Sequence, residues 1–145
     1  MSGIFSAGWA SALERELSVS ETYRRAAAGW KGSLLFHLEP DPALGFAADR
    51  LVFLDLLHGS ARAVRPALPQ DRSAATFALA GPAAVWLDLL EGRLEAGTAL
   101  LGGKLRLTRG SLFSLLPHLA AARALLECAK RVGSGAGATR DEDEP

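Results

Sequence analysis

The part of this sequence that most constrains its fold is residues 91–110, EGRLEAGTALLGGKLRLTRG. From Lys104 to Arg109 the residues alternate, with Leu105 and Leu107 on one face, which is typical of a strand with its other face in water. Upstream of this strand, four glycines divide an apolar run, so that only short helical turns can form. The segment holds almost no reactive side chains. We therefore predict short turns beside a half-buried strand, an arrangement that suits the wall of an apolar cavity.

The length and composition fit one globular domain. A chain of 145 residues can bury a substantial core, and its contents of 49% hydrophobic and 22% charged residues are ordinary for a globular protein. No stretch approaches the roughly 18 apolar residues of a membrane span, and the chain does not begin with a basic leader. The single cysteine, Cys128, falls within an apolar helical pattern, which predicts a buried, inert thiol. We expect a cytoplasmic protein with no stable membrane insertion.

Residues 133–145, GSGAGATRDEDEP, differ in composition from the rest of the chain. A glycine-rich linker followed by an acidic run is typical of a disordered tail. The tail holds one of the 16 basic and four of the 16 acidic residues, so the body is only mildly basic, which argues against a nucleic-acid partner. Its GSGAG run follows a predicted helix rather than a strand, so it does not fit a dinucleotide-binding loop. We predict one domain, residues 1–132, and a tail, residues 133–145.

Two helices are predicted at the start of the domain. Ser11 with Glu14, and Ser18 with Glu21, both have the spacing of a capping box, in which a hydroxyl and a carboxylate satisfy the first free amides of a helix. The first helix should therefore end near Ser18. The second should end near Trp30, whose ring we expect in the core.

Alternation of apolar and polar residues predicts five strands. The second strand is apolar on both faces, which is typical of an interior position, and the third is more polar, as an edge strand would be. Prolines at positions 40 and 42 end the first strand because proline removes a backbone donor. The strands are expected at residues 32–39, 50–57, 61–65, 75–79 and 104–109.

Helices should follow the fourth and fifth strands. Gly81-Pro82 predicts a helix start, and Pro117 predicts another after a short turn at residues 111–116. The last helix has an apolar face formed by Leu119, Ala122, Leu126 and Ala129. The predicted fold class is α/β (α+β), with a five-stranded, mostly antiparallel sheet that is covered by helices on one face and encloses an apolar tunnel.

The motifs of common enzymes are missing from the sequence. The run GTALLGGK lacks the first glycine of a phosphate loop and the Ser or Thr after its lysine, and neither a Gly-x-Ser-x-Gly elbow nor a His-Glu-x-x-His helix occurs. His37 and His58 could approach each other across the first hairpin near Asp55 and Glu39 as metal ligands, although a solvated strand face explains them more simply. His118 starts a helix. We expect no catalysis, no cofactor and no metal.

One part of the chain resembles a known family. Residues 86–110 are similar to the C-terminal half of the sterol carrier protein 2 domain, which has two Gly-basic-Leu motifs separated by a short helix. Gly92-Arg93-Leu94 and Gly103-Lys104-Leu105 occupy these two positions, and Ala99 fits the alanine between them. The order of the predicted elements also resembles the family over about residues 20–130.

The resemblance implies a lipid-binding domain whose apolar tunnel takes a fatty acyl chain, acyl-CoA or a sterol-like molecule. Two positions depart from the family pattern: Ala96 stands where proline is frequent, and the glycine that ends the strand, Gly110, comes one place later. An ordinary packed core would use the same residue types as a tunnel wall, and only an unfilled volume distinguishes a tunnel from a packed core. The residues that the resemblance places on the wall are Trp86, Leu89, Leu90, Leu94, Leu100, Leu101, Leu105, Leu107, Leu112, Phe113, Leu116 and Leu119.

Two functional hypotheses follow. The first is a non-catalytic lipid carrier, in which Lys104, Arg106 and Arg62 would lie near an anionic headgroup or a CoA phosphate. The second is a ligand-free interaction or dimerisation module, an accessory subunit or homodimer that would use an apolar surface patch to hold its partner.

Overall fold

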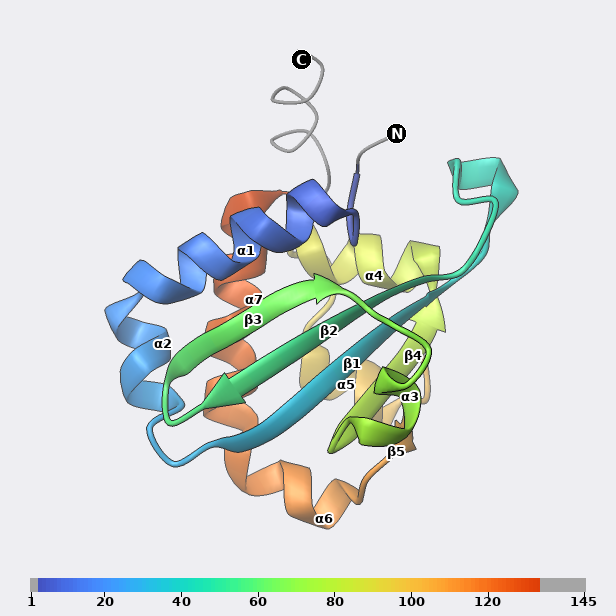
Figure 1. Ribbon diagram of the computed structural model, residues 1–145. Helices are drawn as coiled ribbons and strands as arrows, with labels where there is room; N and C mark the ends of the chain where they lie inside the picture. The colour runs from blue at the N-terminus through green and yellow to red at the C-terminus, as the bar shows by residue number, and fades with distance from the viewer. Residues whose placement is uncertain (1–2, 134–145) are drawn as a thin grey trace.

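A five-stranded mixed sheet lies at the centre of the computed structural model, which describes residues 3–133 (Figure 1). The spatial order of the strands is β3-β2-β1-β4-β5. β1 and β4 are parallel, and the other three neighbouring pairs are antiparallel, which confirms a mostly antiparallel sheet. The strands are β1 (Lys31–Glu39), β2 (Arg50–Leu57), β3 (Ser60–Pro66), β4 (Phe77–Pro82) and β5 (Arg106–Arg109).

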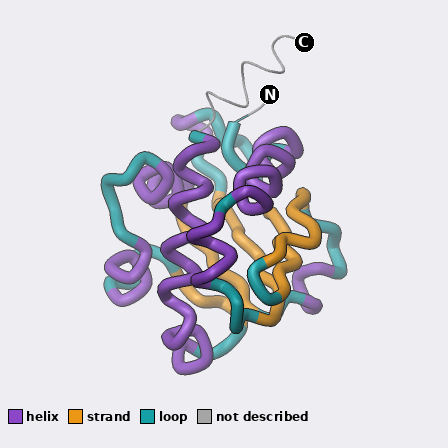
Figure 2. Tube along the Cα trace, turned by 90° about the vertical axis from the view of Figure 1, so that its left-hand side faces the viewer, coloured by secondary structure: helices purple, strands orange, loops and turns teal. Residues whose placement is uncertain are grey.

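Most of the helices cover one face of this sheet, as predicted, and Figure 2 shows them gathered on one side of the strands. The short α3 packs on β1, and its C-cap Ala75 belongs to a smaller apolar cluster on the other face. The longer helices are α1 (Ala7–Val19), α2 (Glu21–Ala26), α4 (Ala83–Leu90), α5 (Ala96–Leu101) and α7 (Leu119–Val132). The shorter elements are η1 (Pro42–Leu44), α3 (Asp71–Ala74), α6 (Leu112–Leu115) and η2 (Leu116–His118).

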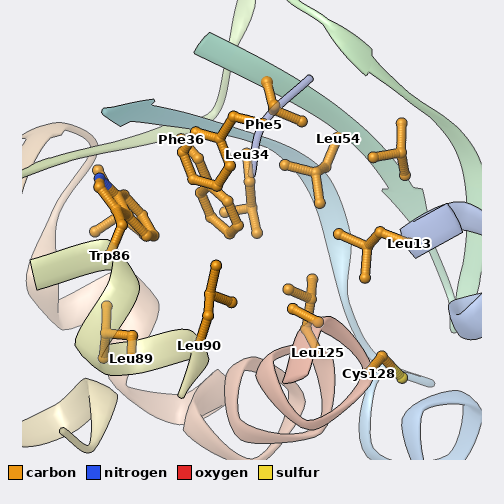
Figure 3. Close-up of a cluster of buried hydrophobic side chains, with 14 of the residues drawn as sticks. Phe5, Leu13, Leu34, Phe36, Leu54, Trp86, Leu89, Leu90, Leu125 and Cys128 are labelled. Carbon is orange, nitrogen blue, oxygen red and sulfur yellow. The ribbon is translucent and has the colours of Figure 1, made fainter. Parts of the chain in front are cut away.

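The strands divide their apolar residues between two cores. Leu34 and Phe36 of β1 face the main core under the helical layer, whereas Leu35 faces a smaller cluster with Phe53 and Ala78 on the other side. β2 is buried on both faces and lies inside the sheet, and β3 lies at its edge, so both predictions from the sequence are confirmed. In the main core, Figure 3 shows side chains of α4 and α7 pointing toward the strands.

One buried carboxylate holds α3 and its loop to the sheet. Asp71 is only 4% exposed, and its Oδ2 accepts hydrogen bonds from Arg65 Nη1 on β3 and from the Leu68 backbone N, each at 2.7 Å. The hydrogen bond from Arg65 is the main cause that lowers the pKa of Asp71 below its ordinary value. The Arg65 guanidinium also lies 4.8 Å from the centre of the Phe53 ring.

The predicted capping boxes are wrong by several residues. Ser11 lies inside α1, which is capped instead by Ser6, whose Oγ accepts a hydrogen bond from the backbone N of Trp9. The helix begins early because the turn before it buries Ile4 and Phe5 in the core, a tertiary contact that the capping pattern does not contain. Ser20 rather than Ser18 caps α2.

The fourth and fifth strands each begin two residues later than predicted. β4 begins at Phe77 because Ala75 is the C-cap of α3. β5 begins at Arg106 because the backbone amides of Lys104 and Leu105 donate hydrogen bonds to the Ala99 carbonyl and so complete the end of α5.

The end of the described chain is apolar. Among residues 3–133, the segment Leu112–Val132 is long and apolar enough to cross a bilayer by length and composition. In the structure this segment is divided into α6, η2 and α7, and α7 packs against α1 and α2. A helix in the core of a globular protein can also be this long and apolar. The predicted tail lies outside the described residues apart from Gly133, the C-cap of α7.

Candidate functional site

An apolar cavity lies between the helical layer and the sheet. Its wall comes from β1, β2 and β4 on one side and from the helices, chiefly α4, α5 and α7, on the other. The volume of the cavity is about 60 Å³. This volume is smaller than the roughly 300 Å³ or more of typical ligand pockets, so the cavity is a small apolar space.

The structure brings together only some of the predicted wall residues. Those that line the cavity are Trp86, Leu89, Leu100, Leu105 and Leu119. Leu90 is part of the main core, and Leu94 and Leu107 pack against that core without lining the cavity. Leu101, Leu112, Phe113 and Leu116 lie on the surface, and Phe113 is 85% exposed.

α7 divides its apolar residues between the cavity and the packed core. The predicted apolar face was incomplete: Leu119, Ala122 and Leu126 are half-buried and line the cavity. A neighbouring face is buried: it includes Ala124, which was not predicted, and Cys128, whose burial confirms the prediction. The helix therefore contributes to packing on one side of its apolar stripe and to the cavity on the other.

The rest of the cavity wall was also missed by sequence reasoning. The alternation of β1 does indicate that Leu34 and Phe36 share a face, but it does not indicate what that face meets. The further lining residues are Tyr23, Trp30, Leu34, Phe36, Leu56, Leu79, Ala96, Leu115, His118, Ala121 and Leu125.

The two Gly-basic-Leu motifs form the same local structure. Gly92 and Gly103 have φ angles of 81° and 80°, in the left-handed region that favours glycine. After each glycine, the next two backbone amides donate to one carbonyl at the preceding helix, that of Asp88 in the first motif and that of Ala99 in the second. The second motif thereby places Leu105 in the cavity wall, so the motif's role is to end a helix and position a leucine.

Gly110 is required by a close approach. Its φ is 94°, and a Cβ at this position would collide with the ring of Phe77. Phe77 in turn packs at 5.5 Å, between ring centres, against Trp30 of the cavity wall. Gly110 therefore allows the chain after β5 to pass close to the Phe77 ring, which packs on Trp30 beside the cavity.

Two polar side chains of the described chain interrupt the apolar wall. Tyr23 is 1% exposed, and its burial, followed by its neighbour Cys128, raises the pKa of its hydroxyl to about 12. The ring of His118 packs edge-on against Trp30, with 4.9 Å between ring centres. His118 therefore lies beside Trp30 at the start of β1, whereas the Tyr23 hydroxyl has Cys128, further along α7, as its neighbour.

The predicted basic cluster is wrong in part. Arg62 lies on β3 and Arg106 on β5, at opposite edges of the sheet, because the strand order was not readable from the sequence. Arg62 pairs with Asp55 at 3.1 Å, and Arg106 pairs with Glu39. Lys104 is exposed and follows the glycine turn next to the cavity-lining Leu105.

The predicted approach of His37 and His58 is also wrong. In the β1–β2 register His37 is opposite Leu51, whereas His58 follows Leu57, which pairs with Lys31 at the other end of β1. His37 Nε2 lies 3.2 Å from Asp49 Oδ2, and His58 Nδ1 lies 3.2 Å from the Ala28 carbonyl. Within residues 3–133 no three His, Cys, Asp or Glu side chains gather as metal ligands would.

Fold and cavity together define a small α/β domain with an apolar cavity between its helices and its sheet. Residues 11–110 match the model of the SCP-2 sterol transfer family, and the chain belongs to that family. The resemblance seen in the Gly-basic-Leu motifs is thus confirmed. The comparison with curated proteins gave no match.

Solved structures agree with this assignment. A crystal structure of sterol carrier protein 2 is 39% identical with a TM-score of 0.79, over 88% of this chain and 97% of that one. A protein from Thermus thermophilus, described as possibly a sterol carrier protein, is 39% identical with a TM-score of 0.82, over 93% of each chain. Sterol carrier protein 2 from Yarrowia lipolytica, at 18% identity and a TM-score of 0.57 over 83% and 88%, shares the fold.

Proposed function

We propose that this protein is a non-catalytic lipid carrier that holds a long apolar molecule in the cavity under its helical layer. A lipid-binding or sterol-transfer role in general follows from membership of the family, whose domain is generally a non-catalytic carrier. The observation that carries the specific proposal is the cavity itself, whose wall is apolar except for Tyr23 and His118. Burial of apolar surface supplies the binding free energy, at about 25 cal/mol per Å².

The shape of the cavity favours a flexible acyl chain over a rigid sterol. At about 60 Å³ the cavity is smaller than either ligand, and a chain that bends can enter between its walls with less rearrangement than a fused ring system. An acyl-CoA headgroup would meet Lys104 without Arg106, which is paired with Glu39, and without Arg62 at the far edge. We therefore propose a lipid with a free acyl chain as the ligand rather than acyl-CoA, and, on the sequence alone, a cytoplasmic location.

Mass spectrometry of the purified protein tests this proposal. Native spectra should show an added mass in stoichiometric amount, and denaturing spectra should release it as a lipid. Protein with Ala122→Leu, which narrows the cavity, should carry less of this mass when purified in parallel. A clean protein mass, together with no binding of a fluorescent fatty acid, would overturn the carrier proposal.

A second candidate function, an interaction module, is favoured by the exposed apolar residues of α5 and α6. Leu101 is 76% exposed and Phe113 is 85% exposed, and apolar residues gathered at a surface are typical of interaction sites. Size-exclusion chromatography with light scattering, with and without fatty acid, separates the two functions. A dimer that does not depend on fatty acid and is lost in Phe113→Ser would support the module, and a monomer that binds fatty acid would support the carrier.

A further inference from the structure

Tyr23 is a polar residue in the wall of an apolar cavity. Tyr23 is held at the start of α2, where its backbone N donates a hydrogen bond of 3.0 Å to Ser20 Oγ. Its side chain lines the cavity and is 1% exposed. Within residues 3–133, no hydrogen bond joins the Tyr23 hydroxyl to another residue.

This hydroxyl has no partner among the described residues but is not sealed off. Among residues 3–133, His37 Nε2 is the one side-chain polar atom that is fully enclosed and has no hydrogen bond. The Tyr23 oxygen also has no hydrogen bond but is not fully enclosed, so it retains some accessible surface. The accessible space beside Tyr23 is the cavity. An unpaired hydroxyl in an apolar site is unfavourable, and a partner that enters the cavity would satisfy it.

The charge state of the hydroxyl decides what that partner is. Burial raises the pKa of Tyr23 to about 12, so at neutral pH the phenol keeps its proton and donates a hydrogen bond. An oxygen acceptor therefore suits it, and a hydrocarbon end does not.

The cavity also has a direction. Trp30 and His118 lie at the start of β1, and Trp86, whose Nε1 donates to the His37 carbonyl at 2.9 Å, lies near its other end. Between them the wall is Leu34 and Phe36. The stretch of wall from residue 30 to residue 37 spans roughly 23 Å at about 3.3 Å per residue.

We propose that Tyr23 donates a hydrogen bond to an oxygen at the head of the bound lipid, so that the protein selects long-chain molecules ending in a carboxyl, hydroxyl or carbonyl group. The head lies beside Tyr23, and the chain lies against Leu34 and Phe36 of β1. This inference rests on the proposed lipid-carrier function and defines its ligand class.

The test compares Tyr23→Phe with Thr22→Val, which removes an exposed hydroxyl from the next residue of the same helix. The ligands are 1-dodecanol and tridecane, which have the same number of non-hydrogen atoms but differ in the oxygen. Binding is measured by displacement of the neutral fluorophore N-phenyl-1-naphthylamine. Tyr23→Phe should weaken the binding of 1-dodecanol roughly three- to tenfold, as the loss of one neutral hydrogen bond predicts, and should leave the binding of tridecane unchanged. Thr22→Val should change neither.

The outcomes separate this inference from the function on which it rests. Equal losses for both ligands in Tyr23→Phe, or no loss for either, would overturn the role of the hydroxyl while leaving the carrier function in place. Failure of both ligands to displace the fluorophore from the unaltered protein would overturn the carrier function itself. The melting temperature of ligand-free Tyr23→Phe should be no lower than that of the unaltered protein, because the hydroxyl has no partner to lose among the described residues, and a large decrease would indicate a structural role instead.

Discussion

Ala122→Leu should fill the cavity and expel its ligand. Ala122 is half-buried on α7 and lines the cavity between Leu119 and Leu126, one helical turn apart on either side, so a larger side chain there enters the empty space rather than the packed core. Ala120→Leu is the matched control, since Ala120 is exposed on the same helix.

The magnitude follows from the added carbon atoms. Leucine has three more carbons than alanine, worth about 2.4 kcal/mol at full burial, from which about 0.5–1 kcal/mol of side-chain entropy is subtracted. The free energy of unfolding should therefore rise by about 1.5 kcal/mol, or roughly 5 °C in Tm. A lipid that loses two or three buried methylenes loses about 2 kcal/mol, a roughly 30-fold weaker Kd. Ala120→Leu should change stability by less than about 0.5 kcal/mol.

The assay is thermal unfolding of the ligand-free proteins followed by titration with a fluorescent fatty acid. Unchanged binding in Ala122→Leu would place the ligand somewhere other than this cavity. A lower Tm, as overpacking by about 1–3 kcal/mol would cause, would show that the space is already filled and would refute the reasoning.

Three further changes test the structure around the site. Gly110→Ala should lower the free energy of unfolding by about 2 kcal/mol in urea denaturation, because φ is positive there and the Cβ meets Phe77, and a neutral result would be contrary to this geometry. Asp71→Asn should cost about 2 kcal/mol at pH 7 by breaking hydrogen bonds from Arg65 and Leu68. Because the folded-state pKa of Asp71 is lowered, its contribution is present above the ordinary pKa of about 3.9 and is lost as pH falls through the folded value, so the difference between the two proteins should shrink below about pH 4, and a constant difference would contradict the assignment. Phe113→Ser should leave Tm within about 1 °C, since the ring is 85% exposed, and a large decrease would mean that it packs in the fold.

The strand pattern was readable from the sequence because it depends on alternation along the chain. The bounds of β2 were predicted without error, and β1, β3 and the short turns before β5 were placed within a residue or two. The N-terminal caps were misread because Ile4 and Phe5 are fixed by contacts with residues far along the chain, such as Phe36, whose ring centre is 6.0 Å from that of Phe5. A local spacing rule does not include such contacts.

The sequence by itself determined the family, the strands and the residue types that could line a cavity, because these follow from local motifs and from periodicity. Only the tertiary structure decided which apolar residues line the empty space and which fill the core: Leu100 and Leu101 are neighbours in sequence, yet one faces the cavity and the other is 76% exposed. It also decided that Tyr23, from a helix the sequence analysis did not connect with the site, lies in the cavity wall. The physical reason is that a cavity is a volume left unfilled by many distant side chains together, and no single segment of the sequence specifies that volume.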